Sequence, residues 1–209
     1  MLKKLYHKIT GKLDASININ LGYLKYYRIK KGDIIVDSGA YLGYFTVFAA
    51  KKVGDSGKVI AFEPDPVNFE ILKKKTASLK NVVLIKKALF NKETEQHWNS
   101  SFAKSAFGKE GYIVNCSTLD KELEKLGIKH VDFLKMDIEG AELEAIEGAK
   151  ETLKNTDNLA IACYHKRDGK TTGELLQPVL GKMGFDTKIG FFLHKTLYGR
   201  KSGKLPFGN

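Results

Sequence analysis

Three acidic residues stand where short apolar runs of the chain end. They are Asp37, Glu63 and Asp137, the last residues of runs that begin at positions 33, 58 and 131. In an open α/β sheet, ligands bind at the carboxyl ends of the strands. Glu63 has the place of the acid that accepts hydrogen bonds from a ribose diol in nucleotide-binding folds. The three acids therefore predict a ribose-containing ligand at one edge of a sheet.

The turn after Asp37 narrows the class of ligand. It reads SGAYLG over residues 38–43, and its glycines let the backbone approach a ligand before a helix begins. The dinucleotide fingerprint G-x-G-x-x-G would need glycines at Tyr41 and Tyr44, and the phosphate-binding motif G-x-x-x-x-G-K-[ST] is absent from the sequence. An acid before the turn would repel a pyrophosphate but suits a cationic ligand. S-adenosylmethionine, with its sulfonium and ammonium groups, fits this requirement.

A second group of acids follows the run 131–137. Asp137 and Glu139 are expected over the ligand, and Gly140 permits a tight turn beside them. Two acids at a strand end are costly without a cation or an acceptor nearby. Glu142 and Glu144 lie in the first turns of the next helix, and we assign them to its dipole.

If S-adenosylmethionine bound here gives its methyl group to a hydroxyl, that hydroxyl must lose its proton. His165, after the fifth predicted strand, has a suitable pKa for that base, with Asp137 or Glu139 as alternatives. A structural, hydrogen-bonded histidine is the competing interpretation. The same three residues could hold Mg²⁺, but separate strand-end acids more often bind substrate or cofactor directly, so we assign no metal.

The elements that must position these residues alternate between strands and helices. Strands are predicted over 33–37, 58–63, 82–85, 131–137 and 159–164, and helices over 44–52, 66–79, 119–126 and 143–153. This alternation of strands and helices implies right-handed crossover connections and a mainly parallel sheet. The tail adds a helix over 175–183 and a hairpin of the runs 187–194 and 196–200. We predict an α/β, Rossmann-like, seven-stranded sheet with an antiparallel C-terminal hairpin strand and helices on both faces.

Length and charge bound the remaining possibilities. The 209 residues, 43% of them apolar and 28% charged, fit a basic N-terminal helix or cap over 1–30 and a single domain over 31–209. Residues 1–31 hold eight basic residues and one acid, which is +7 of the total +11. This arm indicates either an anionic partner such as nucleic acid or simple solubility. No apolar run could span a bilayer and no signal peptide opens the chain, so we expect a cytoplasmic protein.

Several motifs together resemble the FkbM family of S-adenosylmethionine-dependent methyltransferases. They are VDSGAYLGYFTVFAA, VIAFEPDPVNFEIL, KKALFNKE, STLD and VDFLKMDIEGAELEAIEGA, in the correct order within residues 33–165. The resemblance implies a class I methyltransferase fold. It further implies that Asp37, Gly39 and Gly43 shape the methionine side of the cofactor site, that Glu63 holds the ribose and that Ala88 borders the adenine. The full expected cofactor site is Asp37, Ser38, Gly39, Ala40, Tyr41, Gly43, Tyr44, Phe45, Glu63, Pro64, Asp65, Ala88 and Asp137.

The sequence departs from the family pattern at two places. Tyr41 stands where the family has asparagine, and Cys163 replaces the acid of an E-x-H motif that ends at His165. On the acceptor side, the polar stretch 91–115 carries Trp98, which could cover a ring or anchor a loop. The expected acceptor residues are Trp98, Ser101 and Lys166.

Three functions fit these residues. The leading one is O-methylation of a sugar or another small molecule with S-adenosylmethionine. The second is methylation of RNA or other nucleic acid, which the basic arm favours, although only three of the 35 basic residues are arginine and an N-P-P-Y-type loop is missing. The third is S-adenosylmethionine binding without catalysis. The acceptor and the oligomeric state do not follow from the sequence.

Overall fold

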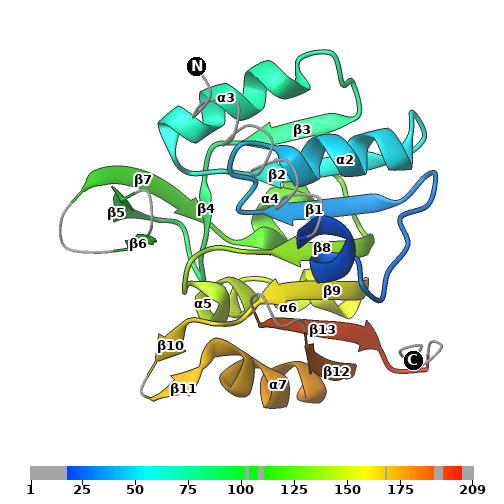
Figure 1. The fold of residues 1–209 in the computed structure, drawn as a ribbon, viewed down its shortest axis with the longest axis vertical. Helices are drawn as coiled ribbons and strands as arrows, with labels where there is room; N and C mark the ends of the chain where they lie inside the picture. The colour runs from blue at the N-terminus through cyan, green and yellow to red at the C-terminus, as the bar shows by residue number, and fades with distance from the viewer. Residues whose placement is uncertain (1–17, 102–103, 108–110, 168, 191–194, 204–209) are drawn as a thin grey trace, which may run out of the picture.

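A seven-stranded sheet forms the centre of the molecule (Figure 1). The computed structural model describes residues 18–101, 104–107, 111–167, 169–190 and 195–203. The strand order is β12-β13-β9-β8-β1-β2-β3, and only β13 runs antiparallel to its neighbours β12 and β9. The strands are β1 (Ile34–Ser38), β2 (Lys58–Phe62), β3 (Val82–Ile85), β8 (Val131–Met136), β9 (Thr156–Ala162), β12 (Phe185–Gly190) and β13 (Thr196–Lys201). The predicted sheet is confirmed, with β13 inserted between β9 and the edge strand β12.

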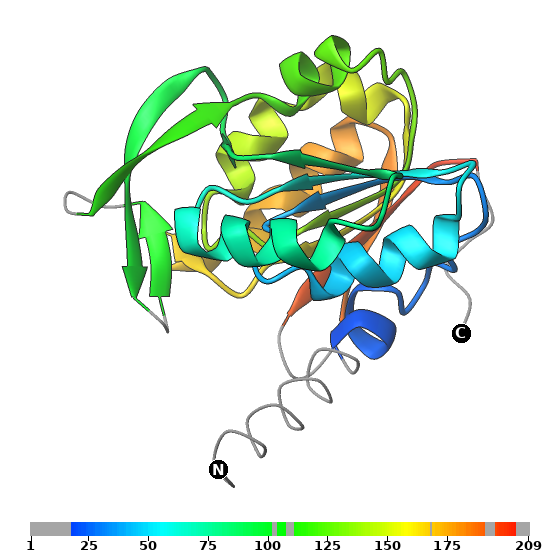
Figure 2. The same ribbon diagram turned by 90° about the horizontal axis from the view of Figure 1, so that it is seen from above.

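Helices cover both faces of the sheet (Figure 2). On one face lie α2 (Tyr44–Val53) and α3 (Pro66–Thr76); on the other lie α4 (Leu119–Lys125), α5 (Glu142–Glu147), α6 (Lys150–Lys154) and α7 (Thr172–Lys182). Successive strand residues point to opposite faces, so Ile35 and Val36 enter two different apolar cores. Because helices cover the sheet on both sides, inner strands such as β1 and β2 are largely apolar, whereas the edge strand β12 has the mixed sequence FDTKIG.

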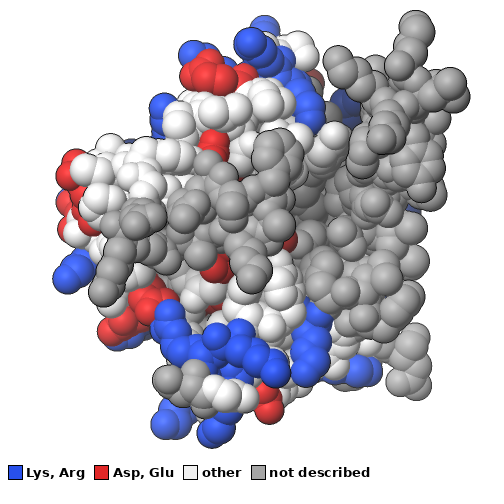
Figure 3. All heavy atoms as spheres, turned by 60° about the vertical axis from the view of Figure 1, so that its left-hand side comes forward, with Lys and Arg blue, Asp and Glu red and all other residues white. Residues whose placement is uncertain are grey.

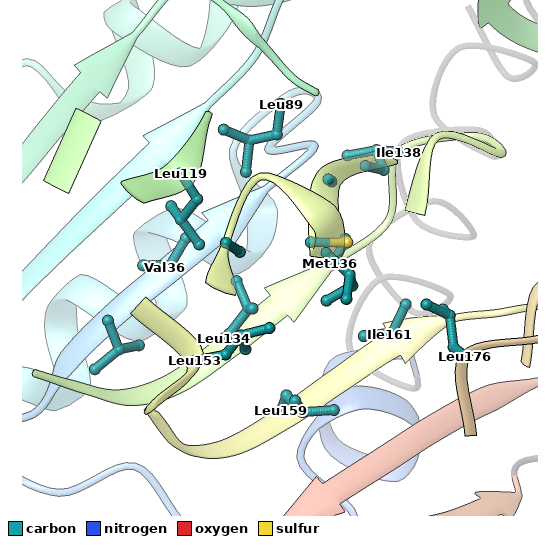
Figure 4. Packing of buried hydrophobic residues seen from close by; sticks show 14 of the residues in the cluster. Val36, Leu89, Leu119, Leu134, Met136, Ile138, Leu153, Leu159, Ile161 and Leu176 are labelled. Carbon is teal, nitrogen blue, oxygen red and sulfur yellow. The ribbon is translucent and has the colours of Figure 1, made fainter. Parts of the chain in front are cut away.

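The larger core lies between the sheet and α4–α7 (Figure 4). Leu134, Met136 and Ile161 from the strands pack there against Leu153 and Leu176 from the helices. All five are fully buried. Burial of each such side chain contributes roughly 1.5–3 kcal/mol before entropy is counted, so this core fixes the level at which β8 and β9 end.

Local signals set the helix boundaries. Asp65 caps α3 by accepting from Val67 N and Asn68 N, at 2.8 and 2.9 Å, and Pro66 occupies the first turn, as predicted. The single helix predicted over 143–153 is wrong, because α5 ends before Gly148 and α6 begins at Lys150. A Cβ at Gly148 would lie 2.2 Å from the carbonyl oxygen of Phe90, so the chain passes too close for an ordinary helical residue.

The polar stretch 91–115 forms strands, which the sequence did not predict. A four-stranded sheet has the order β4-β7-β5-β6 and lies beyond the carboxyl edge of the main sheet, at the left of Figure 1. Its strands are β4 (Ala88–Leu89), β5 (Thr94–Ser101), β6 (Lys104–Phe107) and β7 (Tyr112–Ser117). Tyr112 donates its hydroxyl proton to Asp65 and so ties this sheet to the loop after β2. A short hairpin, β10 (Lys166–Arg167) and β11 (Lys170–Thr171), lies below it.

Residues 18–29, the N-terminal segment, pack onto the main domain. The segment begins with a π-helix, Asn18–Tyr23, and buries Ile19, Tyr23 and Ile29 in the core that contains Ile35 and Phe45. Residues 18–30 of the predicted cap therefore share the core of the domain, whereas the helix predicted over 2–13 lies outside the described residues. Within the described part of the chain, no helix has the length and apolarity needed to cross a membrane.

Candidate active site

The loop after β1 packs directly on the end of β8. Gly39 has φ +77°, and a Cβ there would lie 1.9 Å from the carbonyl oxygen of Asp137. Gly43 has φ +80°, and a Cβ there would lie 2.6 Å from Leu72 Cδ1. Only glycine permits both the left-handed backbone and the close approach. These two positions therefore fix the separation between the β1 loop, β8 and α3.

Asp37 lies beneath this loop, fully buried. It accepts a hydrogen bond from Thr46 Oγ1 at 2.6 Å, and its other carboxylate oxygen is 3.0 Å from Lys135 Nζ. Lys135 Nζ also donates to the carbonyl oxygen of Gly39 at 2.7 Å. The cation beside Asp37 is thus supplied by the chain itself, and the ion pair holds the loop from below. Ser38, also fully buried, and Ala40 complete the loop on its inner side.

Glu63, at the end of β2, joins two loops of the site. One carboxylate oxygen accepts from the backbone N–H of Tyr41 at 2.6 Å, and the other accepts from the backbone N–H of Asp65 at 3.0 Å. Burial raises the pKa of Glu63 to about 7, although both backbone hydrogen bonds favour its charged form. Each oxygen keeps a lone pair that could accept from a hydroxyl of a ligand.

Tyr41 adopts the left-handed conformation, with φ +51°, and its side chain is about half exposed. This is the position at which the family pattern has asparagine, a residue that enters this region more easily than tyrosine does.

Replacement of Tyr41 by asparagine is expected to raise the free energy of unfolding by about 1 kcal/mol, because it relieves the left-handed strain. Urea denaturation measures this change. Tyr44→Asn is the control, since Tyr44 is also partly exposed but begins the helix α2. An equal gain in both variants would contradict the strain argument.

The two carboxylate oxygens of Asp137, just after β8, differ in their hydrogen bonding. Oδ2 accepts from the hydroxyl of Tyr23 at 2.6 Å. Oδ1 is buried and has no hydrogen-bond partner within the described part of the chain. A buried carboxylate oxygen without a donor is costly, so Oδ1 suits a ligand that brings a cationic donor.

His165 lies between two carboxylates. Its Nε2 is 3.0 Å from Glu139 Oε2, and its Nδ1 is 3.6 Å from Glu142 Oε1. Glu139 has φ +56° and a side chain 37% exposed, whereas the Glu142 side chain is fully buried and also accepts from the backbone N–H of Gly140. Glu142 therefore does more than complement the dipole of α5, the role that the sequence predicted. Glu144 instead forms an ion pair with Arg167 at 2.8 Å.

Burial alone would lower the pKa of His165, but its carboxylate neighbours outweigh that effect. The hydrogen bond to Glu139 and the charges of Glu142, Glu139 and Asp137 raise the pKa of His165 above its ordinary value. Burial also raises the pKa of Glu142. Both shifts favour the protonated form of the residue concerned.

Two places are candidates for a metal ion, the sequence-predicted residues around His165 and a second group at the opposite edge of the sheet. At His165, Nε2 is engaged in the hydrogen bond with Glu139, whereas Nδ1 is buried and has no hydrogen-bond partner within the described part of the chain. At the amino ends of β8 and β9, side-chain ligand atoms of His130, Asp132 and Asp157 lie within 4.8 Å of one another. Among the described residues, Asp137, Glu139 and His165 do not form a group of comparably close ligand atoms.

The other sequence-predicted residues lie at three places: near the loops of the site, in the small sheet and on the β10–β11 hairpin. Near the loops, Pro64, Asp65 and Phe45 are buried, and Tyr44 is partly exposed beneath the Lys75 ammonium group, which lies 3.8 Å from its ring centroid. In the small sheet, Ala88 and Trp98 share one buried cluster, so Trp98 packs in that core, as the loop-anchor interpretation proposed, although on a strand. Lys166 is exposed on β10, directly after His165. Ser101 ends β5, and its side chain lies outside the description.

Sequence reasoning missed Tyr23 and Lys135. Lys135 precedes Asp137 by two residues, so the period of a strand already placed both on one face. Tyr23 carries no local signal, because its contact with Asp137 spans 114 positions.

Comparison with solved structures defines the class of this fold. An FkbM methyltransferase from Methylobacillus flagellatus KT aligns with a TM-score of 0.62 and 18% identity over 84% of this chain and 45% of that one. Fibrillarin from Aeropyrum pernix, solved with natively bound S-adenosyl-L-methionine, aligns with a TM-score of 0.59 and 16% identity over 90% of this chain and 74% of that one. The protein has the class I methyltransferase fold, as predicted.

Sequence comparison identifies the family. A family model described as the methyltransferase FkbM domain matches residues 37–186, and the chain belongs to this family. Methyltransferase sdnD of Sordaria araneosa is 27% identical over 160 residues, which covers 56% of this chain and 60% of that protein. The chain thus spans less than two thirds of that relative's length.

Proposed function

We propose that this protein transfers a methyl group from S-adenosylmethionine to a hydroxyl oxygen of a sugar or another small molecule. One observation carries the proposal: a carboxylate suited to a cationic cofactor and a carboxylate–histidine pair suited to a hydroxyl meet at the same strand end. Asp137 offers the buried oxygen Oδ1, and Glu139, two residues later, is hydrogen-bonded to His165. Membership of a methyltransferase family supports the reaction type.

The described residues fit this cofactor. Asp137 Oδ1 would accept from its ammonium group, and Glu63 would accept from its ribose hydroxyls with the lone pairs that the backbone leaves free. Asp37 acts from below, because its bonds to Thr46 and Lys135 hold the loop that would contact the cofactor. When bound, S-adenosylmethionine supplies an electrophilic methyl group.

The chain's task in the reaction is to orient the acceptor and take its proton. The acceptor hydroxyl gives its proton to the Glu139–His165 pair as its oxygen forms the new bond to carbon. The bound cofactor would supply that carbon and would leave as S-adenosylhomocysteine, which keeps the electron pair of the carbon–sulfur bond. The 3.0 Å hydrogen bond between Glu139 and His165 allows either residue to share the proton.

The acceptor side is bordered by basic side chains. Figure 3 shows Lys and Arg gathered on the lower part of the face that it views. The β10–β11 hairpin, at the lower left of Figure 1, exposes Lys166, Arg167 and Lys170. Arg167 is paired with Glu144, whereas Lys166 directly follows His165 in the chain. We propose that Lys166 contacts the acceptor, which favours a polar or anionic molecule. An acceptor panel should therefore contain both neutral sugars and sugar phosphates.

Calorimetric titration with S-adenosylhomocysteine, with and without magnesium, tests the cofactor site. We expect affinity to rise about tenfold between pH 6 and pH 8, because a carboxyl with a pKa near 7 must ionise to accept two ribose hydroxyls. Stability of the unliganded protein should change in the opposite direction. Because the pKa of Glu63 is higher in the folded protein than in the unfolded one, protonation of Glu63 stabilises the folded state. This stabilisation is fully present below the unfolded pKa and is lost as the pH rises through 7.

Glu63→Gln is the matched variant for this titration. It keeps one oxygen acceptor and removes the ionisation, so its affinity should be weaker at pH 8 and nearly independent of pH. A wild-type protein that does not bind S-adenosylhomocysteine at any pH would refute the proposed function. Binding that is equally pH-dependent in Glu63→Gln would refute the role of Glu63.

A further inference from the structure

Tyr23 is buried next to Asp137, a residue of the proposed cofactor site. Its side chain is only 6% exposed, and its hydroxyl donates to Asp137 Oδ2 at 2.6 Å. The ring packs edge-on against Phe45 at 6.2 Å between centroids, and the Lys135 ammonium lies 5.3 Å from it. Tyr23 therefore contacts the helix α2 through Phe45, the strand β8 through Lys135, and Asp137 directly.

The bond between Tyr23 and Asp137 holds a carboxylate without neutralising it. Lys135, the nearby cation, forms its ion pair with Asp37. A phenol hydroxyl donates one hydrogen bond and carries no charge, and burial, with the neighbouring Asp137, raises the pKa of Tyr23 so that it remains a donor. The hydrogen bond thus fixes the orientation of Asp137 through one oxygen and adds no positive charge beside it.

The N-terminal segment is seated independently of this bond. The hydroxyl of Tyr198 donates to the carbonyl oxygen of Gly22 at 2.8 Å, and Arg200 donates to the carbonyl oxygen of Tyr26 at 2.6 Å. The ring of Tyr27 stacks on Phe133 at 4.7 Å. These contacts hold the N-terminal segment in place without the bond between Tyr23 and Asp137. The segment therefore places the Tyr23 hydroxyl next to Asp137.

We propose that Tyr23 is a positioning residue of the cofactor site: it holds Asp137 Oδ2 so that Oδ1 faces the ammonium group of S-adenosylmethionine. This inference rests on the proposed function. It places part of the site before the stretch that the family model matches, which begins at residue 37. The N-terminal segment is then a component of cofactor recognition as well as a cover on the sheet.

Two ligands separate positioning from general support of the fold. S-adenosylhomocysteine carries the amino-acid portion with its ammonium group, whereas 5′-methylthioadenosine lacks that portion and keeps the nucleoside. Tyr23→Phe should weaken S-adenosylhomocysteine binding about ten- to hundredfold, as for a lost hydrogen bond to a charged group, and leave 5′-methylthioadenosine binding unchanged. Calorimetry measures both affinities.

Tyr27→Phe is the matched control. Tyr27 belongs to the same segment and also donates its hydroxyl to a carboxylate, Asp33 Oδ2, at 2.7 Å, but it does not contact the site. It should lower the melting temperature and leave both affinities as in the wild type. Equal weakening of both ligands by Tyr23→Phe, or no weakening, would overturn the proposal.

Asp137→Asn alone keeps the proposal falsifiable if Tyr23→Phe folds poorly, because equal weakening of both ligands by Asp137→Asn would overturn it. Asp137→Asn should itself weaken S-adenosylhomocysteine selectively, and adding Tyr23→Phe to it should cause no further selective loss, because Tyr23 acts through Asp137. Additive losses would overturn the proposal. Failure of the wild type to bind S-adenosylhomocysteine would instead refute the proposed function, so the two failures are distinguishable.

Discussion

His165→Ala is expected to lower the rate of methyl transfer by about 10²- to 10⁴-fold, the range that a positioned general base contributes. Affinity for S-adenosylhomocysteine should stay within a factor of about three, since His165 contacts Glu139 and Glu142 and not the predicted cofactor residues. The measurement is S-adenosylhomocysteine formation over an acceptor panel, together with calorimetry.

Two further variants sharpen this result. Glu139→Gln removes the hydrogen-bonded carboxylate that raises the pKa of His165, so the rising limb of its rate–pH profile should move to lower pH. His130→Ala is the control, because His130 is about half exposed and lies at the opposite edge of the sheet. Full activity in His165→Ala would remove the residue from the mechanism and leave a structural histidine.

Gly39→Ala is expected to have the largest effect on folding. The added Cβ would lie 1.9 Å from a backbone oxygen of Asp137, which no side-chain rotation can relieve, and the backbone there has φ +77°. We expect a loss of about 3 kcal/mol or more in the free energy of unfolding. Any folded fraction should bind S-adenosylhomocysteine more weakly, because the β1 loop must move away from β8.

Gly127→Ala separates the cost of the left-handed backbone conformation from the cost of the steric clash that Gly39→Ala also creates. Gly127 has φ +66°, and nothing lies within 4 Å of a Cβ placed on it. Its replacement should therefore cost only the left-handed strain, about 1 kcal/mol. Urea denaturation of both variants gives the comparison, and similar costs would show that the contact between Gly39 and Asp137 is unimportant.

The main sheet could be predicted because its strands are apolar on both faces. Runs such as residues 58–62 and 131–136 stand out from the helices that separate them, and the acids that end them mark one edge. The small sheet escaped prediction for the opposite reason. Its longest strand, TEQHWNSS, has Trp98 as its single strongly apolar residue, so no period of two is visible.

The site was predictable where neighbours in sequence are neighbours in space. Asp137 and Glu139 share one turn, and the capping function of Asp65 follows from the proline after it. The environment of each acid was not predictable. That Asp37 is paired with Lys135, and that Glu142 is buried against His165, depends on packing between different strands and helices.

The two anchors of the N-terminal segment have a consequence for synthesis on the ribosome. Tyr198 holds Gly22 across 176 positions, and Arg200 holds Tyr26 from the same strand, β13. Contacts between such distant positions close large loops and form late. A nascent chain emerges with its first residues leading, so Tyr23 must wait for β13 before its backbone is held. We expect a ribosome-bound chain to build the sheet from β1 to β9 first and to acquire an ordered cofactor site only after β13 has been made.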